Sequence, residues 1–212
     1  MCRSPILNQL HRQIHCQRRR MPTFASRVSR PFDVFINHRS IDTKRTVASL
    51  LHDHLARLNL RPFLDSKHMK PGDKLFDHIH AAIKETKIGV AVFSPRYCES
   101  YFCLHELALF MEMKKKVIPI FCDVKPSELR VVDNSGFSKK EIQRFNLALE
   151  EAKYTVGLTF DSLKGNWSDV VTNAGEIVVD SLKELEERHL RQFYSGICFR
   201  KHYLTGTGNN KD

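Results

Sequence analysis

The sequence lacks long hydrophobic runs. None of its apolar segments approaches the roughly 20 residues that a membrane-spanning helix needs, so we expect no membrane span. It also contains neither the GxGxxG motif nor the GxxxxGK motif followed by Ser or Thr, so a glycine-lined phosphate cradle is not expected. A ligand would therefore have to be bound by side chains.

Paired cysteines of the CxxC type are also missing. The six cysteines stand at positions 2, 16, 98, 103, 122 and 198, and no apolar signal segment begins the chain. This pattern predicts free thiols in a reduced, intracellular compartment, the cytoplasm with or without the nucleus. The histidine pairs at 52 and 54 and at 78 and 80 diverge by roughly 200° on predicted helices, so no metal site is expected. No bound cofactor is expected either.

Acidic residues are absent from residues 1–30, which contain seven arginines and no lysine. Of the 34 basic residues, 27 therefore remain beyond residue 30 to face 24 acids, so most of the net charge of +10 belongs to this segment. We predict a disordered basic tail, with an organelle transit segment as the alternative. Nucleic-acid binding is not expected of the remaining chain and could only be an accessory function of the tail.

Strand-like and helix-like segments alternate five times along the chain. The predicted strands are 32–36, 61–64, 88–93, 117–121 and 155–160, and the predicted helices are 43–58, 75–85, 104–113, 139–154 and 169–191. The apolar run 88–93 is typical of a strand buried on both faces, whereas Pro62 suits an edge strand. The pattern predicts an α/β three-layer sandwich of flavodoxin-like type, with a five-stranded parallel sheet of order 2-1-3-4-5 and helices on both faces. The domain would span 31–191, followed by a frayed tail at 192–212.

The predicted helix 104–113 carries one acid, Glu106, in apolar surroundings. On a helical wheel Glu106 lies opposite the core stripe, among four apolar side chains: Cys103, Leu109, Phe110 and Met113. Desolvation there would raise the pKa of Glu106 unless a partner compensates. The alternative interpretation is a partly exposed structural acid.

Ligands of such folds bind beyond the carboxyl ends of the strands, where the predicted loops 37–42, 65–74, 94–102 and 122–138 meet. The residues available there are Asn37, Arg39, Ser40, Asp65, Lys67, Lys70, Ser94, Arg96, Phe102, Cys103 and Glu106. Arg39 and the lysines could engage phosphates, and Phe102 could stack on a ring. Glu106 could hold a ribose hydroxyl or stabilise an oxocarbenium-like transition state. Alternatively, Arg39 is a surface cation, Phe102 caps the core and Cys103 is a small buried hydrophobe.

Five ordered segments resemble the boxes of plant TIR (Toll/interleukin-1 receptor) domains. They are 32–44 (FDVFINHRSIDTK), 63–72 (FLDSKHMKPG, similar to the BB loop), 92–97 (VFSPRY), 102–107 (FCLHEL, similar to WCLDEL) and 117–127 (VIPIFCDVKPS). The match runs from about 31 to 190. The chain therefore resembles a stand-alone TIR protein, and the resemblance carries expectations about its activity.

The resemblance implies an NAD⁺ glycohydrolase of plant immune signalling that is active when self-associated. NAD⁺ would be the substrate, and ADP-ribose or its cyclic isomers would signal to lipase-like immune complexes. The family's catalytic glutamate corresponds to Glu106, its substrate-contacting arginine to Arg39, its BB loop to residues 65–72, and its box cysteine to Cys103. A non-catalytic adaptor that binds other TIR domains is the alternative.

The chain departs from the family pattern beside the expected site. Phe102 stands where tryptophan is usual, and His105 stands where aspartate is usual. His38 and Ser40 flank Arg39 in place of phenylalanine and glycine. Ser49 is followed by leucine in place of the histidine of a common self-association surface.

Overall fold

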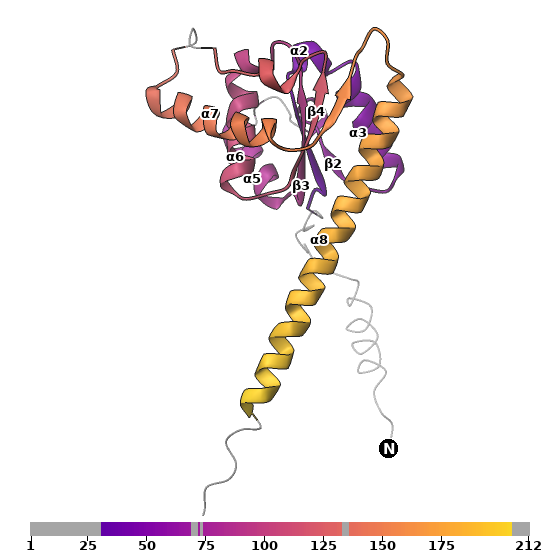
Figure 1. Ribbon diagram of the computed structural model, residues 1–212, viewed down its shortest axis with the longest axis vertical. Helices are drawn as coiled ribbons and strands as arrows, with labels where there is room; N and C mark the ends of the chain where they lie inside the picture. The colour runs from indigo at the N-terminus through magenta and orange to yellow at the C-terminus, as the bar shows by residue number, and fades with distance from the viewer. Residues whose placement is uncertain (1–30, 69–71, 73, 133–135, 205–212) are drawn as a thin grey trace, which may run out of the picture. The chain divides into compact units, whose positions relative to one another are not determined.

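A single parallel sheet organises the protein (Figure 1). The computed structural model describes residues 31–68, 72, 74–132 and 136–204, so the predicted basic tail and Lys70 lie outside the described residues. The strands are β1 (Val34–His38), β2 (Pro62–Phe63), β3 (Ile88–Phe93), β4 (Val117–Cys122) and β5 (Leu158–Phe160). Their order is β2-β1-β3-β4-β5, and all pairs are parallel. The predicted flavodoxin-like fold and strand order are confirmed, including the edge position of the strand that contains Pro62.

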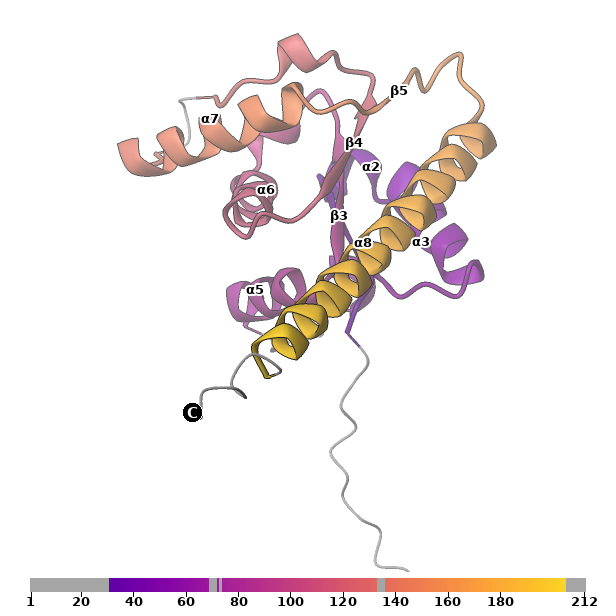
Figure 2. The same ribbon diagram turned by 60° about the horizontal axis from the view of Figure 1, so that its bottom comes forward.

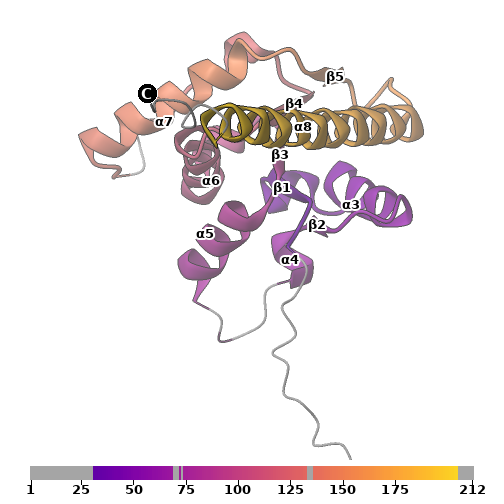
Figure 3. The ribbon, with the colours of Figure 1, turned by 90° about the horizontal axis from the view of Figure 1, so that it is seen from below.

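Helices cover both faces of the sheet (Figure 2). The helices α5 (Leu75–Glu85), α6 (Tyr101–Glu112) and α7 (Lys139–Lys153) lie on one face. The helices α3 (Val47–Arg57) and α8 (Trp167–Leu204) lie side by side on the other. Seen from below, α5 and α6 flank β1 and β3 on one side and α3 flanks them on the other (Figure 3).

Strand side chains alternate between two hydrophobic cores. In β1, Val34 and Ile36 join the core under α3 and α8, whereas Phe35 joins the core under α5, α6 and α7. In β3, Val90 and Phe93 divide between the two cores in the same way. Because successive side chains of a strand point to opposite faces, an uninterrupted apolar run is what a doubly covered sheet requires.

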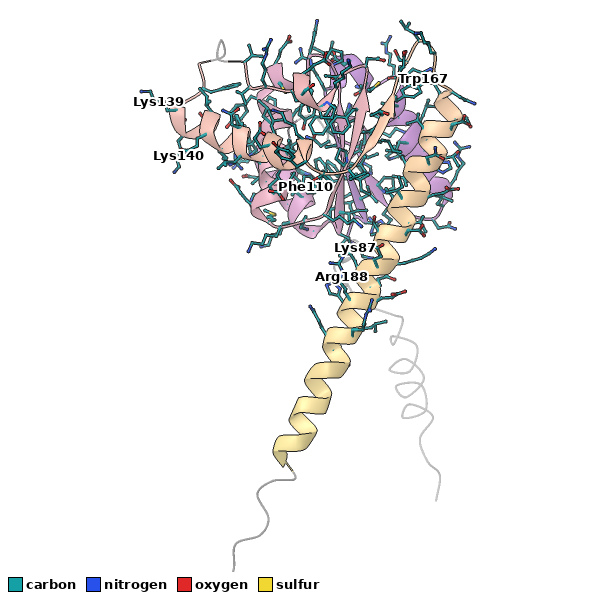
Figure 4. All side chains as sticks on the ribbon, viewed as in Figure 1. Lys87, Phe110, Lys139, Lys140, Trp167 and Arg188 are labelled. Carbon is teal, nitrogen blue, oxygen red and sulfur yellow. The ribbon has the colours of Figure 1, made fainter. Side chains whose placement is uncertain are left out.

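Close packing between α6 and the sheet depends on a glycine. A Cβ atom added at Gly89 of β3 would lie 2.9 Å from Cε1 of Phe110. Figure 4 shows the Phe110 side chain in the densely filled interior between α6 and the sheet. The close approach of α6, which carries Glu106, to β3 therefore requires the absence of a side chain at this position.

Several predicted boundaries are wrong. The strand β1 is 34–38 rather than 32–36, and β5 begins at Leu158 rather than at residue 155. The expected helix 43–58 is divided into α2 (Ser40–Thr43) and α3, and the expected loop 65–74 begins with the short helix α4 (Asp65–His68). The helix α6 begins at Tyr101 because the Ser100 hydroxyl accepts a hydrogen bond from the Cys103 backbone N–H, which caps the helix. The helix α8 continues to Leu204, so the predicted end at residue 191 is too early. In the described part of the chain no helix is both long and apolar enough to cross a membrane.

Candidate active site

The candidate site lies where the chain order reverses, between β1 and β3. Asn37 is near the carboxyl end of β1, and Glu106 is on α6, which follows β3. Open α/β sheets bind ligands at such a switch point, because the flanking loops run away from it in opposite directions. The fold therefore brings Asn37 and Glu106 together across 69 positions of sequence.

Glu106 is buried, with 7% of its surface exposed. Its Oε2 accepts a hydrogen bond of 2.7 Å from Nδ2 of Asn37. Burial raises the pKa of Glu106 to about 8; the hydrogen bond from Asn37 opposes this shift, and the charge of Asp65 adds to it. The expected rise in pKa is confirmed, and the alternative of a partly exposed acid is wrong.

The Asn37 amide is fully engaged beneath the site. Its Nδ2 also donates to the Cys103 carbonyl oxygen at 3.1 Å, and its Oδ1 accepts a hydrogen bond from the Tyr97 hydroxyl. Asn37 is 1% exposed, and Tyr97 is completely buried. The structure thus places Asn37 behind Glu106, whereas the sequence suggested a residue that touches substrate directly.

Cys103 packs under the same network. Its Sγ donates to the His38 carbonyl oxygen at 3.3 Å. Burial raises the pKa of its thiol to about 12, with a smaller contribution from Glu106. Because the thiolate is the nucleophilic form, Cys103 is unreactive in this state and acts as a small buried hydrophobe.

Arg39 is held by two carboxylates at the rim. Its Nε lies 3.5 Å from Asp42 Oδ2, and its Nη2 lies 3.2 Å from Glu99 Oε2. The Ser94 hydroxyl donates to the same Asp42 oxygen at 2.7 Å. Arg39 and Ser94 are therefore brought together, with Asp42 between them, and Arg39 is more than the lone surface cation of the alternative interpretation.

Of the remaining polar candidates, Asp65 lies at the rim of the site and Lys67 does not. Asp65 Oδ1 lies 3.4 Å from Nε2 of the buried His38, which places Asp65 at the rim. Lys67 instead contacts Asp53 and His52 of α3, so the structure does not bring it to Glu106. Ser40 begins α2 and is half-buried.

Two exposed aromatic rings lie at the start of α6. Phe102 precedes Glu106 by one helical turn, so the two share a face of α6, and its ring is 41% exposed. The ring of Phe76, at the start of α5, is 48% exposed and lies 5.4 Å from that of Phe102. His105 stacks on Tyr101 at 5.6 Å, its ring lies 5.5 Å from that of Phe76, and its Nδ1 is 3.0 Å from Nη1 of Arg144.

Sequence reasoning missed Tyr97 and Phe76. Tyr97 lies four residues after the end of β3, and its position in the loop after the buried strand was the signal that could have pointed to it. Phe76 stands out only by being apolar on the exposed side of α5, which is a weak signal. Together the site offers a buried carboxyl, an arginine at the rim and a pair of exposed aromatic rings nearby. Such a set can hold an anionic ligand with a ring and stabilise positive charge on it.

Comparison with known proteins identifies the family. Residues 31–184 match the TIR domain family. The chain belongs to it. The Glu106 site of this TIR domain therefore lies within the matched region, and the expectations drawn from the sequence motifs refer to the correct family.

The relatives of this TIR domain include plant proteins with different architectures. It is 47% identical over 165 residues to the "Probable 2' cyclic ADP-D-ribose synthase BdTIR" of Brachypodium distachyon, covering 76% of this chain and 74% of that protein. It is 36% identical to "TMV resistance protein N" of Nicotiana glutinosa, covering 57% of this chain but 12% of that protein. Among solved structures, the TIR domains of the activated Roq1 resistosome match with a TM-score of 0.60 and 26% identity, over 69% of this chain and 99% of theirs.

Within residues 31–68, 72, 74–132 and 136–204, no group of three or more His, Cys, Asp or Glu side chains could hold a metal ion. The three cysteines with described side chains, Cys98, Cys103 and Cys122, are buried and free.

Proposed function

We propose that this protein is an NAD⁺ glycohydrolase that splits NAD⁺ into nicotinamide and ADP-ribose or a cyclised form of it. The observation that carries the proposal is the buried carboxyl of Glu106, with its pKa raised to about 8, at the switch point of the sheet. The relationship to a named cyclic ADP-ribose synthase supports it. NAD⁺ is then a substrate, and the reaction needs no further cofactor.

Glu106 acts on the charge that develops on the ribose. When the bond between C1′ and the nicotinamide nitrogen breaks, nicotinamide leaves with the electron pair and the ribose becomes oxocarbenium-like. The ionised Glu106 carboxylate stabilises that positive charge in a dry environment, where the interaction is strong. Attack by water then gives ADP-ribose and a proton, whereas attack by a hydroxyl of the same molecule gives a cyclic product.

The neighbouring side chains suit the rest of the substrate. Phe102 and Phe76 supply a stacking surface for a ring, and Arg39 can bind the diphosphate by exchanging the exposed carboxylate of Glu99 for it. Lys70, in the BB-loop segment, remains a predicted substrate contact, as does Ser40. For Lys67 the ion pair with Asp53 is a competing role.

Self-association is proposed to control the reaction. Because the Glu106 carboxyl is buried in the single chain, substrate contact requires a rearrangement that exposes it. TIR domains of a relative occur in an activated resistosome, which supports contact between TIR domains as the trigger. We further propose a role in plant immunity in which lipase-like complexes sense the product, as the family resemblance of the sequence implies. The cytoplasm, with or without the nucleus, is the proposed compartment, consistent with the three free thiols.

The test is release of nicotinamide from NAD⁺ by purified full-length protein over a range of protein concentrations. We expect the rate per molecule to rise with concentration, and Glu106→Ala to abolish release while leaving the fold intact. A Glu106→Ala protein as active as the wild type would refute the assignment. A folded wild-type protein that binds other TIR domains but never consumes NAD⁺ would establish the adaptor function instead.

A further inference from the structure

A chain of buried hydrogen bonds ends on Glu106. It runs from the Tyr97 hydroxyl to Asn37 Oδ1, and from Asn37 Nδ2 to Glu106 Oε2 at 2.7 Å. We propose that Asn37 and Tyr97 are positioning residues for the cleavage reaction: Asn37 holds one oxygen of the Glu106 carboxyl, so that the other faces substrate, and Tyr97 fixes the orientation of the Asn37 amide. This inference rests on the proposed function of Glu106.

When Glu106 is ionised, the surroundings of Asn37 permit one orientation of its amide. The two hydrogens on Nδ2 have two acceptors in reach, the Glu106 carboxyl and the Cys103 carbonyl oxygen at 3.1 Å. Oδ1 faces the Tyr97 hydroxyl, whose oxygen is also 3.0 Å from the Cys103 carbonyl. Turning the amide by half a rotation would place Oδ1 against two oxygen atoms, leaving buried acceptors without donors.

The orientation of the amide determines which form of Glu106 is favoured. An N–H donor stabilises the ionised carboxylate, whereas an amide oxygen in its place would stabilise only the protonated acid. Burial and the charge of Asp65 on α4 both work against ionisation. Tyr97 and Cys103 face the same space as neutral groups, since burial raises the pKa of each, and Arg39 acts on Cys103 from the rim. The hydrogen bond from Asn37 is thus the contact that favours the charged form required for catalysis.

Tyr97 supports this arrangement without touching the acid. Removing its hydroxyl would leave Asn37 Oδ1 buried without a donor and would free the amide to turn. Tyr97 is not placed to touch a ligand, because no part of it is exposed and its ring packs edge-on against Phe93, with the ring centroids 4.6 Å apart.

Two substitutions in the full-length protein test the proposal. Tyr97→Phe removes the hydroxyl, and Asn37→Asp replaces the N–H donor by a second carboxyl without changing volume. For each, kcat and KM for nicotinamide release are measured between pH 5.5 and 9.5, at a protein concentration that activates the wild type. We expect kcat at pH 7 to fall about tenfold or more, KM to stay within about twofold, and the midpoint of the pH profile to move upward.

Tyr154→Phe is the matched control, because Tyr154 is 86% exposed and its loss of a hydroxyl should leave both kcat and the pH profile unchanged. Circular dichroism and thermal unfolding establish that each variant is folded. If Tyr97→Phe does not fold, the isosteric variant Asn37→Asp alone tests the positioning role. Its two facing carboxyls should titrate as a coupled pair, with the apparent pKa of the second step raised.

The outcomes distinguish this inference from the proposed function. If Glu106→Ala is inactive but Tyr97→Phe and Asn37→Asp keep the wild-type pH profile, the positioning role is refuted and the glycohydrolase stands. A rise in KM for Asn37→Asp with kcat unchanged would also refute it, because Asn37 would then bind substrate directly. If Glu106→Ala retains activity, the proposed function itself fails.

Discussion

Glu106 links the stability of the protein to pH. Its folded-state pKa of about 8 lies above the 4.5 of an ordinary glutamate, so the folded state holds the proton more tightly than the unfolded state. The stability that this difference contributes is fully present below about pH 4.5 and is lost as the pH rises through about 8. The ionised Glu106 carboxylate, which is proposed to act in catalysis, therefore lowers the free energy of unfolding at alkaline pH.

Glu106→Gln should remove this dependence, because glutamine stays neutral. We expect the variant to match the wild type near pH 4.5 and to exceed it in free energy of unfolding at pH 9 by several kcal/mol, since each unit of pKa difference corresponds to about 1.4 kcal/mol. Urea denaturation at pH 4.5, 7 and 9 measures this. Glu151→Gln, which alters an exposed glutamate on α7, is the control and should show no such trend.

Phe102 allows binding to be separated from chemistry. Phe102→Ala should raise KM for NAD⁺ about tenfold, because stacking of an aromatic side chain on a base contributes roughly 1–3 kcal/mol. Stability should change little, since the ring is 41% exposed. Phe102→Trp should preserve or improve KM. An unchanged KM in Phe102→Ala would show that substrate rings bind elsewhere.

At the scale of elements, the start of α6 connects the fold to the site. Ser100 caps α6 and Ser138 caps α7, and each hydroxyl accepts a hydrogen bond from the backbone N–H three residues later. Substitutions at the two serines therefore form a matched pair of variants. Ser100→Ala and Ser138→Ala should each lower the free energy of unfolding by about 1 kcal/mol. Only Ser100→Ala should also reduce nicotinamide release, because α6 carries Glu106. Equal activity in both variants would mean that the start of α6 does not control the acid.

The contact between Gly89 and Phe110 gives an element-scale test of packing. Gly89→Ala should destabilise the protein by about 1–3 kcal/mol, because the new methyl group meets the Phe110 ring. Combining it with Phe110→Leu should recover part of that loss, and urea denaturation of the double-mutant cycle measures the coupling. Strict additivity would show that the two residues do not interact.

Helices and strands with strong periodic patterns were predicted closely. The helix α5 and the strand β3 have the predicted ends, since each is an apolar pattern with polar or proline residues beside it. The division of 43–58 into two helices escaped prediction, because the apolar spacing begins only at Val47 and the preceding polar residues give no period. The short helix α4 also escaped prediction, because its residues are polar and give no helical period.

The site was predicted only in part, and the reason is physical. A helical wheel placed Glu106 among apolar neighbours, which is a local property of α6. Its hydrogen bond from Asn37 and the support of Tyr97 depend on pairs 69 and 60 positions apart, which no local pattern contains. Likewise, Lys67 was assigned to the site from its loop, but its ion pair with Asp53 depends on where α3 lies.

At the scale of the whole molecule, charge and catalysis belong to different parts of the chain. Deleting residues 1–30 should leave nicotinamide release and the melting temperature of the domain unchanged, because the matched family region begins at residue 31. Any salt-sensitive binding of nucleic acid should be lost, since seven arginines are removed. Binding assays at 50 and 200 mM salt measure this. Salt-sensitive binding that survives the deletion would place it on the domain.

The short outer strands have a consequence for a protein that is proposed to work when crowded. β2 has two residues, one of them a proline, and β5 has three. Long, flat edge strands allow neighbouring chains to join their sheets into fibrils, whereas strands this short leave few free backbone groups for such pairing. Contacts between crowded copies should therefore come from helices and loops rather than from a continuous sheet.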